Sequence, residues 1–182
     1  MPPRRSGPDS LAALVEAFHC RPSLNGLRVV LAAAGHAGRR AEVRAHLIER
    51  LEAGAAADPR LLYRLYLEDG QEAEAALAAR RLGEPGPLIE VAEASAPRFR
   101  MLALQLYLEA ADLLARQGSR PAYARAAGVL SRLRAAMEGE EGRWIVVLQG
   151  FRECHRRRRA LVQELIRAGL DLGDVPPLAE VP

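Results

Sequence analysis

The stretch "RECHRRRRALVQEL", residues 152–165, contains the side chains of this chain best suited to bind an anion. Arginine forms bidentate contacts with phosphates and carboxylates, and four arginines stand here in a row. On a single helix Arg152, Arg156 and Arg159 share one flank, while Arg157 lies across the polar face. The candidate contacts to a nucleic acid or to an acidic protein partner are therefore Arg152, Arg156, Arg157 and Arg159.

A simpler interpretation of the same stretch is a solvated basic helix face whose aliphatic stems cover apolar surface. Glu153 precedes Arg157 by four residues, a spacing worth about 0.3–0.5 kcal/mol on a helix. The aromatic residues that could stack on bases lie mostly at core-like spacings, so nucleic-acid binding would be electrostatic and independent of sequence. We prefer the solvated face and keep phosphate binding as the alternative.

Two Cys-His pairs, His19-Cys20 and Cys154-His155, raise the question of a zinc site, because two Cys and two His form a sufficient ligand set. Adjacent residues on a helix point about 100° apart, so neither pair chelates a metal ion well. We expect buried thiols and core histidines, no metal or other cofactor, and no Cys20–Cys154 disulfide in a reducing compartment.

The chain has no lysine and no threonine, which excludes P-loop and Schiff-base lysines and a threonine nucleophile. It also lacks the Gly-x-Ser-x-Gly, His-Glu-x-x-His and Gly-x-Gly-x-x-Gly motifs. The sequence therefore predicts that the protein is not an enzyme and has no catalytic residues.

Composition favours an all-α protein, because 49% of the 182 residues are hydrophobic, only 4% are aromatic, and Ala and Leu dominate. The net charge of +3 is compatible with an anionic partner. Arginine-only basic residues fit the codon bias of a GC-rich bacterial genome. No secretory signal or membrane-length apolar run is found, so we expect a cytoplasmic protein without membrane contact.

Glycine and proline divide the chain into segments of helical length. Asp9 or Ser10 is expected to cap the first helix, Asp58-Pro59 to start the fourth, and Ser119 to cap the helix after Gly118. The expected helices are 11–20, 24–38, 39–54, 60–70, 71–83, a short one through 88–91 after a turn at 84–87, 98–118 started by 95–97, 122–137, and about 143–168.

The segment 98–118 has two apolar faces, and a helix of this kind is usually packed between neighbours. One face consists of Leu102, Leu106, Ala110 and Leu113, and the other of Met101, Leu104 and Leu108.

Helices joined by short turns predict stacked antiparallel hairpins, a right-handed α-solenoid similar to tetratricopeptide repeats. We expect one helical-repeat domain at 9–170, between a flexible N-terminus at 1–8 and a flexible Pro-rich tail at 171–182.

Three stretches, "LLYRLYLEDGQEAEAALAARRLG", "PAYARAAGVLSRLRAAM" and "RWIVVLQGFRECHRRRRALVQELIRAGL", together resemble the C-terminal helical-repeat region of bacterial SWIM-type zinc-finger proteins. The resemblance covers roughly residues 27–170 and implies a platform for protein–protein interaction. The Cys-x-Cys and Cys-x-His zinc motif of that family is missing, since only Cys20 and Cys154 are present, so no family site residue is carried over.

Taken together, these patterns predict a non-enzymatic adaptor or scaffold that presents a helical-repeat surface to another protein. The alternative is a nucleic-acid-binding accessory protein that uses Arg152, Arg156, Arg157 and Arg159. The sequence names neither the partner nor the oligomeric state.

Overall fold

The computed structural model describes residues 8–53 and 58–171, and this part of the chain contains ten α-helices and no strand. The helices are α1 (Pro8–Cys20), α2 (Leu24–His36), α3 (Arg40–Glu52), α4 (Pro59–Glu68), α5 (Glu72–Leu82), α6 (Pro85–Ser95), α7 (Arg100–Arg116), α8 (Arg120–Ala136), α9 (Glu141–Cys154) and α10 (Arg159–Arg167). The all-α prediction is confirmed. Within the described ranges, no helix combines the length and apolarity needed to cross a membrane.

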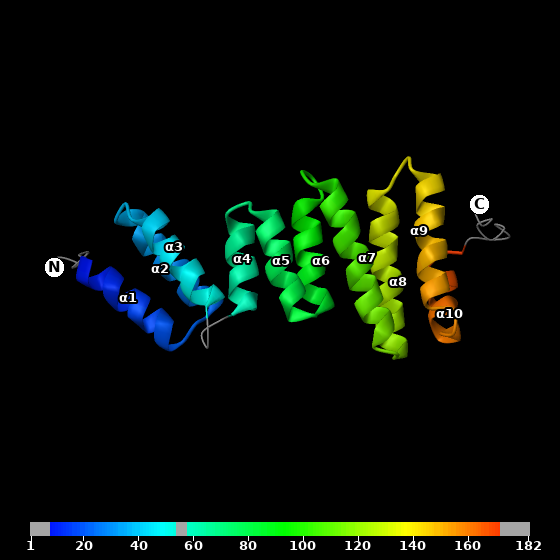
Figure 1. Cartoon of the computed structure of the whole chain (residues 1–182), viewed down its shortest axis with the longest axis horizontal. Coiled ribbons are helices and arrows are strands. Elements are labelled where there is room, and N and C mark those ends of the chain that lie inside the picture. The colour runs from blue at the N-terminus through cyan, green and yellow to red at the C-terminus, as the bar shows by residue number, and fades with distance from the viewer. Residues whose placement is uncertain (1–7, 54–57, 172–182) are drawn as a thin grey trace, which may run out of the picture.

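The helices stand side by side in chain order, as Figure 1 shows. Each helix from α1 to α7 contacts the next one, and α10 turns back to pack against α8. The predicted flexible ends at 1–8 and 171–182 lie outside the described residues, apart from Pro8 and Asp171.

Two predicted helix starts are confirmed in atomic detail. The Asp58 carboxylate accepts hydrogen bonds from the backbone N–H groups of Arg60 and Leu61, and Pro59 occupies the first helical position. The Ser119 hydroxyl accepts from the Ala122 N–H at 3.3 Å. Gly118, directly before it, has φ +75°, a left-handed conformation that ends α7 and that glycine adopts without steric cost.

Three predicted boundaries are wrong. Asp9 and Ser10 lie inside α1, which begins at Pro8. The 84–87 turn is the start of α6, because the first helical turn does not need the N–H groups that Pro85 and Pro87 lack. Ser95 ends α6 instead of starting α7, since its carbonyl accepts from Arg98 and Phe99.

Alanine provides the closest packing in the middle of the array. The helices α5, α7 and α8 bury small side chains completely where they face their neighbours, and the removal of side-chain bulk lets helix axes approach closely. These residues include Ala75, Ala76, Ala79, Ala103, Ala110, Ala111, Ala115 and Ala126.

Candidate functional site

The arginine-rich segment is not one helix. The predicted helix at about 143–168 is broken into α9 and α10 by a turn at residues 155–158. His155 is buried, and its Nε2 lies 3.0 Å from Oδ1 of Asp112 on α7. Arg158 Nη1 donates to the Ala115 carbonyl at the end of α7, at 2.6 Å. These two contacts hold the turn against α7, and no glycine or proline stands between Phe151 and Ala168 to signal the break.

The shared flank predicted for Arg152, Arg156 and Arg159 therefore does not form. Arg152 is in the last turn of α9, with its Nη1 3.7 Å from Asp171, whereas Arg156 is in the turn and donates to Glu153 at 2.8 Å. Glu153 thus pairs with Arg156 and not with Arg157 as expected.

Arg157 and Arg159 are the candidate arginines that stay available to a partner. Both are exposed, and neither side chain forms a hydrogen bond or ion pair with any residue in the described part of the chain. The turn borders a concavity of about 540 Å³, which residues 153–158 line. This concavity is polar and carries three arginines, so it suits an anion better than an apolar group.

Helical spacing gives the C-terminal segment one apolar stripe, and most of this stripe is buried despite the break. Trp144, Leu148, Phe151 and His155 are buried, and the His155 ring lies 4.7 Å from the Phe151 ring, centroid to centroid. These large side chains hold α9 against the array.

A second concavity, which we call the apolar groove, lies between the first half of α7, the end of α8 and the start of α9. It encloses about 410 Å³ and is lined by Met101, Leu102, Leu104, Gln105, Leu108, Leu133, Met137, Arg143 and Val147. Seven of these nine side chains are apolar. The groove follows the α7 face formed by Met101, Leu104 and Leu108, which the sequence predicts to be covered by a neighbour.

That prediction is wrong for the start of α7. Leu104 is buried, but Leu108 is only half-buried and Met101 is 58% exposed. The signal for the groove was present in the sequence as a second apolar face on one helix. What the sequence could not supply is that α9 fails to cover this face completely.

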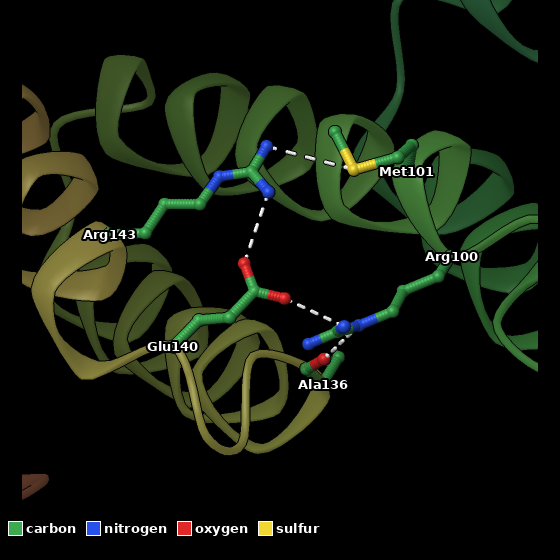
Figure 2. Close-up of polar contacts among 5 residues, drawn as sticks. All are labelled: Arg100, Met101, Ala136, Glu140 and Arg143. Carbon is green, nitrogen blue, oxygen red and sulfur yellow. Dashed lines mark hydrogen bonds and ion pairs between the residues drawn. The ribbon is translucent and has the colours of Figure 1, made fainter.

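Charged side chains lie beside Met101 at one edge of the groove, which we call the rim. Arg143 lines the groove, and Figure 2 shows Glu140 between Arg143 and Arg100. Arg100 on α7 donates from Nε to the Ala136 carbonyl at the end of α8, at 2.8 Å, and its Nη1 lies 2.7 Å from Glu140 Oε1. Arg143 on α9 donates from Nη1 to Glu140 Oε2 at 3.0 Å, and its Nη2 lies 3.6 Å from the Met101 sulfur. Two guanidinium groups therefore share one carboxylate at the rim.

The cysteines and histidines lie differently from the expectation. Cys20 and Cys154 are exposed, free thiols, so the prediction of buried thiols is wrong, whereas His155 is a core histidine as predicted. His19 and His46 bring their rings 5.4 Å apart. In the described residues, no group of three or more His, Cys, Asp or Glu side chains is placed to hold a metal ion.

His19 has the clearest electrostatic perturbation among these residues. Burial lowers the pKa of its imidazole from the ordinary value, and the positive charge of Arg50 and the proximity of His46 lower it further, while Glu16 opposes the shift. Its Nε2 is buried without a hydrogen-bond partner among the described residues.

Comparisons with known proteins found no significant match to this chain. No protein-family model matches the sequence. No curated protein and no solved structure matches it significantly.

Proposed function

We propose that this protein is a non-enzymatic adaptor that binds another protein through the apolar groove between α7, α8 and α9. The observation that carries the proposal is the partly uncovered face of α7. Met101 is 58% exposed beside a groove lined by six further apolar side chains. Apolar surface that is left open beside charged groups is typical of a protein-interaction site.

The arrangement of the helices supports an adaptor role. A row of helices in which each one from α1 to α7 contacts the next suits a tetratricopeptide-like solenoid, an architecture that offers extended surfaces to partners. The resemblance to the helical platform of SWIM-type proteins points in the same direction. Such an adaptor would act in the reducing cytoplasm, where the exposed thiols of Cys20 and Cys154 stay free.

Site-specific photo-crosslinking tests this function. A benzophenone amino acid placed at Met101 should crosslink a defined partner in cells, which is then identified and shown to bind the purified protein. Leu77 on α5 offers a matched control, because it is also a 58% exposed hydrophobic residue. Crosslinks of the same pattern and yield from both positions, or none from Met101, would contradict the proposal.

A second candidate function is sequence-independent binding of nucleic acid by the turn at 155–158. The observation that favours it is that Arg157 and Arg159 are exposed and have no acidic partner among the described residues. Their contacts with phosphates would release counterions, so the affinity would fall steeply with salt.

Fluorescence anisotropy of labelled single- and double-stranded DNA and RNA across a salt series tests this candidate. Binding should be lost in the double variant Arg157→Glu/Arg159→Glu and kept in Arg40→Glu/Arg81→Glu, which changes the net charge equally at exposed arginines on other helices. Equal loss in both variants would indicate a general charge effect, and absence of binding at low salt would exclude the function.

A further inference from the structure

We infer that the occupant of the apolar groove is an amphipathic helix of a partner protein that carries a carboxylate beside its apolar face. The inference rests on the proposed function and specifies the chemistry of the partner. Its basis is the shape of the α7 face, the lining of the groove and the charge at its rim.

The shape of the α7 face favours a helical occupant. Met101, Leu104 and Leu108 recur at spacings of three and four residues, so they form a ridge along one side of α7. From Met101 to Leu108 the ridge runs about 10 Å, at 1.5 Å per residue. A partner helix with apolar side chains at i, i+3 or i+4, and i+7 matches a ridge of two turns.

The lining favours apolar anchors over polar ones. Among the described residues that line the groove itself, only Gln105 and Arg143 have polar side chains. Met101 and Met137 are unbranched, and such side chains adjust to the shape of an inserted residue. The volume of about 410 Å³ lies within the range of sites that enclose several apolar groups.

The rim favours an acidic residue on the partner. Arg100 and Arg143 share the carboxylate of Glu140, whereas Glu138 and Glu141, the other carboxylates of this connection, line a separate concavity with Arg134. The contacts at the rim therefore set two guanidinium groups against one carboxylate. Arg100 is committed to the Ala136 carbonyl and to Glu140. Arg143 is 49% exposed, and one of its terminal nitrogens faces only the Met101 thioether, a weak acceptor.

A partner carboxylate would replace this thioether contact. It would accept a charge-assisted hydrogen bond from Arg143 Nη2, while Nη1 keeps its bond to Glu140 (Figure 2). The exchange needs no movement of α7 or α9, because Arg143 already extends across the mouth of the groove to Met101. Arg143 is therefore the residue expected to decide which helices bind.

A displayed library of 16-residue helical peptides tests the inference. The peptides would carry leucine at i, i+4 and i+7, with flanking positions randomised among acidic, basic and neutral residues. Selection on the full chain should enrich Asp or Glu at one flanking position. Anisotropy with the selected peptides should show a loss of about tenfold in affinity for Arg143→Glu.

Charge reversal on the peptide provides the sharper readout. A peptide with Arg at the selected acidic position should bind Arg143→Glu better than it binds the unchanged chain. Arg81→Glu, an exposed arginine on α5 without a partner among the described residues, should leave every affinity unchanged. Met101→Glu should block acidic peptides, because the new carboxylate occupies Arg143, and circular dichroism should confirm that both groove variants stay folded.

The other outcomes separate this inference from the proposed function. Peptides that require the groove, as judged by Val147→Glu, but show no acidic preference would overturn the inference and leave the adaptor function standing. Sedimentation that shows self-association lost in Val147→Glu would make a second copy the occupant and would also overturn it. Absence of any groove-dependent peptide, with no Met101 crosslink, would overturn both.

Discussion

Two junctions of the helical array are built from different side chains. Where α7 meets α6 and α8, completely buried alanines such as Ala103, Ala111 and Ala126 separate the helices. Where α9 meets the array, the separating side chains are Trp144, Leu148 and Phe151. At the first junction the alanines are completely buried, and we call it the closed junction; the second, which we call the open junction, borders a groove of about 410 Å³.

The difference shows how side-chain size sets the surface of a helical array. Packed helix axes lie about 8–10 Å apart, and small residues at the contact favour the lower end of this range while large residues favour the upper end. Where two helix axes lie further apart, large side chains must fill the space between them along the whole length of the contact. On α9 the filling side chains begin at Trp144, and the adjacent Arg143 and Val147 leave the start of α7 partly uncovered.

Removal of the largest side chain at the open junction should have the largest effect. Trp144→Ala should lower the free energy of unfolding by about 3–5 kcal/mol, because the buried indole is replaced by a cavity. Urea denaturation followed by circular dichroism measures the change. Val146→Ala, at an exposed position of the same helix, should stay within about 0.5 kcal/mol. A comparable loss in both variants would mean that α9 is not held by its buried face.

Enlargement of a residue at the closed junction should come next. Ala111→Leu should destabilise the protein by about 1–3 kcal/mol, because the completely buried site has no room for three more carbons. Val147→Leu adds a methylene beside the groove and should change stability by less than about 0.5 kcal/mol. The same measurement serves both variants. Equal changes in the free energy of unfolding for Ala111→Leu and Val147→Leu would show that the two junctions do not differ in packing.

Much of this architecture follows from the sequence, because it is encoded locally. Asp58, Ser119 and Gly118 specify helix ends through their own hydrogen bonds and backbone preferences. Alanine and leucine specify the all-α class. The buried positions of Trp144 and Leu148 follow from helical periodicity.

The candidate sites were harder to predict, because contacts between distant segments decide them. The break after Cys154 depends on Asp112 and Ala115, each of which lies 43 residues before its partner, His155 or Arg158. Helical periodicity placed Arg156 and Arg159 on one flank because it assumes an unbroken helix and takes no account of contacts with distant segments. Similarly, the apolar face of α7 was recognised, but its exposure depends on where α9 packs.

The polar anchor at the other end of α9 should contribute less than Trp144. His155→Phe keeps a ring against Phe151 but removes the bond to Asp112, and it should cost about 0.5–1.5 kcal/mol. Arg116→Gln removes only an exposed ion pair with the same Asp112 and should cost less than about 1 kcal/mol. Equal losses would mean that the charge of Asp112, and not the turn, is what stabilises this end.

A third junction, at the opposite end of the array, contains titratable side chains: His19 of α1 meets His46 of α3. Because burial, and then Arg50, lower the pKa of folded His19, the unfolded chain binds this proton more readily. Stability should therefore be fully present above the unfolded pKa of about 6.5 and should fall as the pH drops below it.

His19→Gln removes the titrating group, so urea midpoints measured at about pH 7.5 and about pH 5.5 should differ less than in the unchanged chain. His36→Gln provides the matched control, because it removes a histidine of α2 that has no ring or ion-pair contact among the described residues. Its midpoints should keep the full dependence on pH. If the difference between the two urea midpoints is reduced equally in both variants, the loss of stability in acid does not originate at the α1–α3 junction. The histidine-lined junction would then respond to pH no differently from the alanine-lined one.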